Sequence, residues 1–190
     1  MSEDRGAVAL TASVPRTLAR DAAALLGFSA ALAVAAGVIK TPMHLPGHSA
    51  IFWMPVLVVA GSHRRPGMAV GSAVLGGAMA SLWGGVGGLD FGCLLAAAAM
   101  VQACSLARSP ESRGTWMLAA GVLGHLGKLG IKVTAALASG LPLNHTGLLL
   151  LPTLGLYVAF GLIGGVLAWG ALAASRRLGR VDDHGSSEES

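Results

Sequence analysis

Six apolar segments, separated by short polar or turn-forming stretches, are the feature that most constrains how this chain can fold. Apolar runs of about 18 residues or more, with almost no charge, are typical of helices that cross a membrane. Hydrophobic residues make up 54% of the sequence and charged residues only 12%, about half the charged share of a soluble domain. The sequence therefore predicts an all-α membrane protein, a bundle of six transmembrane helices. The predicted segments are 17–39, 50–62, 68–86, 91–107, 115–138 and 148–175.

Positive charge is distributed unevenly between the two sets of segment ends. One set carries ten of the thirteen Lys and Arg residues, and the opposite set carries Lys40 alone. Because positively charged loops stay in the cytoplasm, both termini are predicted to be cytoplasmic. We expect residues 1–16 to be a flexible N-terminus, residues 17–178 the transmembrane domain and residues 179–190 a disordered tail. The ten cations are Arg5, Arg16, Arg20, Arg64, Arg65, Arg108, Arg113, Arg176, Arg177 and Arg180.

The stretch Thr41–Trp53 interrupts this pattern of apolar segments. Two prolines and a glycine within six residues exclude a continuous helix here. The segment that follows, 50–62, is short for a membrane span. It reaches a workable length only if part of His44–Ser49 lies below the membrane surface, buried against protein, because irregular backbone at that depth cannot face lipid.

Three segments, 40–49, 84–92 and 139–147, are predicted to face the outside, and they hold nearly all the non-terminal polar side chains. Polar groups in non-helical segments at membrane depth usually line a cavity, so we expect these residues to contact a ligand. Structural alternatives remain: the histidines of the first loop cap a turn, Asp90 caps the fourth helix, and the last loop is a polar turn. Trp53 is either a wall of the pocket or an interfacial anchor. The polar residues are His44, His48, Asp90, Asn144 and His145.

The fifth segment carries a polar stripe. His125, Lys128 and Lys132 are spaced by three and four residues, so they share one face of a helix. A lysine near the centre of a bilayer costs roughly 2.5–3.5 kcal/mol, so each needs a partner, a water-filled cavity or access to the surface. Two interpretations stay open. If Asp90 pairs with Lys128, the pair is a structural salt bridge; if not, the lysines offer a site for a ligand carboxylate or phosphate.

A metal site is the alternative interpretation of the loop histidines. His44 and His48 have the i, i+4 spacing of two ligands on one helix face, with His145 as a third candidate, but Pro46 and Gly47 make a regular helix improbable. Two neighbouring lysines also disfavour a bare divalent cation. This interpretation would make the chain a metal-uptake subunit, a metal-dependent membrane enzyme or a redox subunit. A third hypothesis is a structural subunit of a larger membrane complex.

Other functional classes lack their motifs. The sequence has no nucleotide-binding motif, no serine nucleophile elbow, no HExxH and no paired intramembrane carboxylates. The sequence also lacks a basic stripe with interleaved aromatic residues, the pattern that indicates nucleic-acid binding. The net charge of +4 is accounted for by cytoplasmic arginines that face anionic lipid. We therefore expect no enzyme and no cofactor, apart from a metal ion on the alternative interpretation.

The layout of six predicted spans, cytoplasmic termini and polar outer loops resembles the S components of energy-coupling-factor (ECF) transporters, small membrane subunits that capture substrate. The resemblance implies uptake of a small, anionic or vitamin-like solute across a prokaryotic cytoplasmic membrane. It also implies a coupling transmembrane subunit, docked through Ala31 and Ala35, and an ATPase pair. The sequence Met43-His-Leu-Pro46 is similar to the N-terminal sequence of the processed proteins in the cobalt and nickel branch of this family. Here a whole span precedes it, so no free N-terminal amine can act as a ligand.

Overall fold

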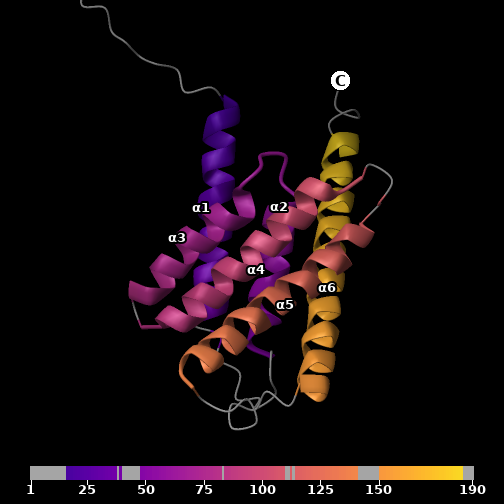
Figure 1. The fold of residues 1–190 in the computed structure, drawn as a ribbon. Helices are drawn as coiled ribbons and strands as arrows, with labels where there is room; N and C mark the ends of the chain where they lie inside the picture. The colour runs from indigo at the N-terminus through magenta and orange to yellow at the C-terminus, as the bar shows by residue number, and fades with distance from the viewer. Residues whose placement is uncertain are drawn as a thin grey trace, which may run out of the picture.

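The structure, a computed structural model, describes residues 16–37, 39, 48–82, 84–109, 112, 114–140 and 150–185. Every regular element within these residues is helical, which confirms the all-α prediction. Three helices are long and apolar enough to cross a membrane: α1, α4 and the part of α6 over Leu151–Arg177. Figure 1 shows the elements in order. They are α1 (Arg16–Gly37), the 3-10 turn η1 (His48–Ala50), α2 (Trp53–Gly61), α3 (Met68–Leu82), α4 (Gly88–Ala107), α5 (Thr115–Ala138) and α6 (Leu150–Gly185).

Helix boundaries lie within about three residues of the predicted ones, except at the C-terminal ends of α3 and α6. Helix α3 ends at Leu82, four residues early, and α4 begins at Gly88, because Gly84 between them adopts a left-handed conformation with φ of 71°. Helix α6 continues to Gly185, so it includes residues 179–185 of the expected tail. After Pro152 no proline interrupts this helix, and adding a residue to an existing helix costs little. Residues 1–15 and 186–190 lie outside the described part.

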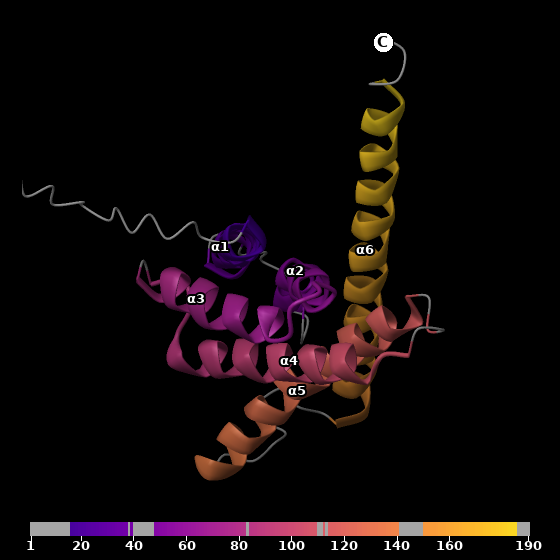
Figure 2. The same ribbon diagram turned by 90° about the horizontal axis from the view of Figure 1, so that it is seen from above.

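Helix α2 is the centre of the bundle. It has nine residues, about 14 Å of helix, and it packs against each of the other α-helices. Figure 2 shows it between α1 and α6, with α3 and α4 alongside. Protein therefore covers most of this short helix, and Pro55, Val56 and Val59 are partly exposed. Its buried residues are Trp53, Met54, Leu57, Val58, Ala60 and Gly61.

Glycines bring the backbones of α5 and α6 into direct contact. A Cβ added at Gly161 would lie 2.6 Å from the Cα of Val122, and one added at Gly165 would lie 2.7 Å from the carbonyl oxygen of Met117. Gly121, on the facing side of α5, packs against the same two glycines. Small residues of this kind allow close helix packing in lipid. The packing partner of Gly161 and Gly165 in α6 is therefore the backbone of α5 around residues Met117–Val122.

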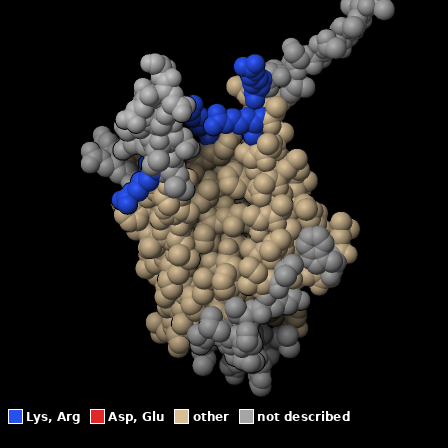
Figure 3. All heavy atoms as spheres, turned by 180° about the vertical axis from the view of Figure 1, so that it is seen from behind, with Lys and Arg blue, Asp and Glu red and all other residues tan. Residues whose placement is uncertain are grey.

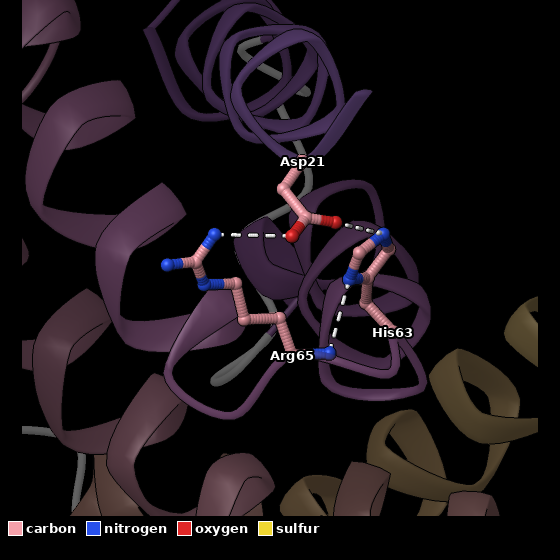
Figure 4. A network of polar contacts seen from close by, with 3 residues as sticks. All are labelled: Asp21, His63 and Arg65. Carbon is pink, nitrogen blue, oxygen red and sulfur yellow. Dashed lines mark hydrogen bonds and ion pairs between the residues drawn. The ribbon is translucent and has the colours of Figure 1, made fainter. Parts of the chain in front are cut away.

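The start of α1 and the end of α6 lie at the same end of the molecule (Figure 1). On the face shown in Figure 3, the described Lys and Arg side chains gather at this end. A polar cluster ties the α2–α3 connection to α1 here (Figure 4). Arg65 donates to Asp21 at 3.0 Å, and His63 lies 3.7 Å from the same carboxylate. Asp21 thereby neutralises part of the positive charge in the connection.

We predict that Gly165→Val destabilises the bundle by about 1–3 kcal/mol, since the added side chain would overlap the α5 backbone. Gly170→Val is the matched control, because a Cβ there meets nothing within 4 Å, and its effect should stay within about 0.5 kcal/mol. Unfolding by sodium dodecyl sulfate in mixed micelles, followed by tryptophan fluorescence, measures both. Equal stabilities for the two variants would contradict the assigned helix contact.

Candidate functional site

A cavity of about 280 Å³ lies where the C-terminal end of α1, the start of α2, the residues 84–87 and the first turns of α4 meet. It is at the opposite end of α1 from Arg16, and therefore away from the cluster of basic side chains. Its apolar wall is formed by Ala36, Ile39, Val86 and Leu94. The polar and aromatic side chains that line it are His48, Ser49, Trp53, Asp90, Cys93 and Lys128.

Lys128 is the charged group buried most deeply at this cavity. The residue is 2% exposed, and its Nζ donates a hydrogen bond of 2.6 Å to the Oγ of Ser49. The same nitrogen lies 5.5 Å from the centroid of the Trp53 ring, within the range of a cation–π contact. No described carboxylate lies within 4.0 Å of it. The ammonium is thus held by a hydroxyl and an aromatic face, with no ion pair.

Glycines and small residues in α5 place Lys128 at the cavity. A Cβ at Gly124 would lie 2.9 Å from the Sδ of Met54 in α2, and a Cβ at Gly127 would lie 3.1 Å from the carbonyl oxygen of Ala96 in α4. The backbone of α5 therefore approaches both helices closely. The thiol of Cys93 in α4 also lies 3.7 Å from the carbonyl oxygen of Lys128 in α5. This packing lets the lysine side chain cross to η1.

Asp90 lines the same cavity from the first turn of α4 and is exposed. The expectation that Asp90 is the N-cap of this helix is wrong, because α4 begins at Gly88 and its N-cap is Gly87, which has no side chain to cap with. A carboxylate in the first turn is still favourable near the positive end of the helix dipole. The salt bridge with Lys128 does not form, since the structure has no such pair within 4.0 Å. The structural salt bridge is thus excluded in this structure, and the alternative, a site for a ligand carboxylate or phosphate, stays a prediction.

His125 lies behind the cavity wall. It is fully buried, and its Nδ1 lies 3.2 Å from the carbonyl oxygen of Gly121. Its ring stacks on Trp53, with centroids 6.5 Å apart and planes at 7°, and meets Tyr157 edge-on at 6.3 Å. His125 does not line the cavity. It packs against Trp53, which does line the cavity. This position does not favour the predicted direct contact between His125 and a ligand.

The remaining predicted residues fall into three groups. Lys132, one turn beyond Lys128, is half-buried and does not line the cavity. His44, Asn144 and His145 lie outside the described residues. Of the predicted partner-docking pair, Ala31 is exposed but Ala35 is 6% exposed and packs in the core. In this chain Ala35 is a core residue, and docking of a partner at Ala31 and Ala35 stays a prediction.

Within the described residues, no group of three His, Cys, Asp or Glu side chains could hold a metal ion. Only His48 of the three candidate histidines lies in that part of the chain. The metal interpretation therefore stays a prediction.

Two cavity residues with polar side chains, Ser49 and Cys93, were not among the predicted ligand contacts. Ser49, which accepts the hydrogen bond of Lys128, follows a histidine in a proline-rich stretch and has no distinguishing pattern in the sequence. Cys93 of α4 is buried against α5, and it also borders the cavity. The long-range pairing of α4 with α5 decides this position, and spacing within α4 does not reveal it.

We predict that Ser49 and Lys128 are energetically coupled. Ser49→Ala should cost about 1–3 kcal/mol of stability, because the ammonium loses its acceptor, and the cost should vanish in a Lys128→Met background. A double-mutant cycle, measured by unfolding in mixed micelles, gives the coupling energy. The cycle of Ser49→Ala with Lys132→Met is the control and should be additive within about 0.5 kcal/mol. Additivity in the Lys128 cycle would disprove the interaction.

Comparison with protein-family models, with curated proteins and with solved structures finds no match for this chain. The resemblance to S components therefore stays a prediction. Three features of the structure bear on function: the cavity, the buried ammonium of Lys128, and the helices that are apolar enough to cross a membrane.

Proposed function

We propose that this chain is a membrane subunit that captures a small anionic solute in the cavity beside Lys128. The observation that carries the proposal is the ammonium of Lys128, which is buried at a cavity wall without a carboxylate within 4.0 Å in the described residues. Burial of an ammonium in an apolar helix costs several kcal/mol unless the charge is compensated. A carboxylate or phosphate group on a ligand would supply that compensation.

The shape of the cavity supports a small ligand. About 280 Å³ is at the lower end of the volumes that bind small molecules. Its lining combines apolar residues with Lys128, the hydroxyl of Ser49 and the indole of Trp53. Such a lining suits a solute with an apolar body and one anionic group. Asp90 at the exposed rim would select against solutes that carry additional negative charge there.

Uptake from outside follows from the topology that we propose. The bundle has six membrane-embedded helices with both termini in the cytoplasm, and the basic side chains at one end face the inner surface. The cavity is at the other end of α1, which would then face outward. Because the sequence contains no nucleotide-binding motif, energy for uptake would come from partner subunits, as the resemblance to S components implies.

A binding screen tests the solute site. Purified protein is titrated with small carboxylates, phosphate esters and vitamins, each paired with an uncharged analogue, and thermal stability and tryptophan fluorescence are recorded. We expect an anionic compound to bind and Lys128→Met to weaken its binding at least thirtyfold, roughly 2 kcal/mol or more.

Lys132→Met is the matched control, since Lys132 lies on the same helix but does not line the cavity. Its affinity should stay near that of the unmodified protein. If no anion in the screen binds, or if both lysine variants lose binding equally, the site is not the one proposed.

The proposed topology is tested with reporter fusions. A fluorescent protein that folds only in the cytoplasm should be active when fused after Ser190 and when inserted after Arg64, whereas a periplasmic phosphatase at the same positions should be inactive. Phosphatase activity after Ser190 would overturn the assignment of the basic end to the cytoplasm.

A further inference from the structure

A second hollow, of about 340 Å³, lies at the basic end of the bundle, between the α4–α5 connection and α6. It does not belong to the solute cavity, and neither hollow shares a lining residue with the other. Its polar and aromatic lining consists of Arg108, Ser109, Ser112, Trp116, Trp169 and Arg176.

The two arginines give this hollow a positive charge that no described carboxylate neutralises. Every ion pair among the described residues involves Asp21, which does not line the hollow. Arg108 lies over the ring of Trp116, 5.5 Å from its centroid, and reaches the carbonyl oxygen of Ser62 at 3.4 Å. Arg176 is exposed on α6. Guanidinium groups bind phosphate oxygens with two parallel hydrogen bonds, so this pair suits a phosphate.

The surfaces beside the hollow are apolar. Trp169 is 55% exposed, and the preceding turns of α6 expose Leu162, Val166 and Leu167. On the other side of Arg108 and Trp116, a shallow hollow is bordered by apolar residues of α4 and α5. A ligand with one phosphate group and two long hydrocarbon chains on the same glycerol backbone would fit this arrangement, because the charged group meets the arginines and apolar surfaces for the chains lie beside them.

The position of Trp169 is fixed by the α4–α5 connection. Gly114 has a positive φ of 108°, and a Cβ there would lie 3.0 Å from the Cδ1 of Trp169. The indole therefore packs directly on the backbone at the start of α5. Tryptophans concentrate at the headgroup level of membranes, where one edge of the ring is wet and the rest is apolar. Trp116 and Trp169 thus place this hollow at the depth of lipid phosphates.

We propose that this hollow binds the headgroup phosphate of an anionic glycerophospholipid, between Arg108 and Arg176, with its acyl chains along α6 and along the α4–α5 surface. The proposal concerns the basic end of the molecule and does not depend on the solute site.

The test uses the full-length protein in nanodiscs and in detergent. Brominated phosphatidylglycerol, added to phosphatidylcholine nanodiscs, should quench the fluorescence of Trp116 and Trp169 at a lower mole fraction than brominated phosphatidylcholine does, by about tenfold. Native mass spectrometry should show retained phosphatidylglycerol on the protein released from detergent. Trp169→Phe should remove part of the quenching and identify the site.

Arg176→Gln and the double variant Arg108→Gln with Arg176→Gln should reduce the preference for phosphatidylglycerol to that for phosphatidylcholine. Arg176→Gln alone keeps the contacts of Arg108, so it covers the case in which the double variant fails to fold. The control is Arg64→Gln with Arg177→Gln, two exposed arginines that do not line the hollow; it should keep the preference.

Equal loss in the control would show general attraction to anionic lipid and overturn a defined site. Unchanged binding by Arg176→Gln would overturn it as well. Inorganic phosphate or glycerol phosphate that displaces the lipid at micromolar concentration would show a site for a soluble phosphate, and this result would also contradict the lipid assignment.

Discussion

The fold depends on the packing of α2 among the other described α-helices. This helix has nine residues, about 14 Å of helix, and it is not one of the three helices long and apolar enough to cross a membrane. It contacts each of the other described α-helices, and six of its residues are buried, while Pro55, Val56 and Val59 are partly exposed. The described turn before it, η1, packs against α6 and α2. Its residues His48 and Ser49 line the cavity.

Close backbone contact makes this packing feasible. Around α2 the neighbouring helices approach one another through glycine, as Gly161 does against Val122 and Gly76 does against the carbonyl oxygen of Ser29. Water-driven burial contributes little between helices in lipid, so close packing has to supply the attraction. The abundance of glycine, 28 residues in all, is consistent with this requirement.

The sequence predicted where the helices lie along the chain better than it predicted which helices pack against one another. The bounds of α5 agree with the prediction, and Lys128 was identified because a charge inside an apolar run is costly wherever the helix lies. The central place of α2 could not be predicted, since a side chain that faces lipid and one that faces protein are equally apolar. Ser49 was missed for a related reason: its partner is 79 residues away in the sequence. Asp90 was misplaced within its helix because glycines before it blur where the helix begins.

The hydrogen bond between Lys128 and Ser49 fixes the direction of the ammonium. A lysine ammonium has three N–H donors, and the hydroxyl at 2.6 Å accepts one of them. The side chain is therefore held in place while two donors stay available. A further acceptor at this cavity would meet a lysine whose rotamer is already ordered, so its bond would cost little additional side-chain entropy.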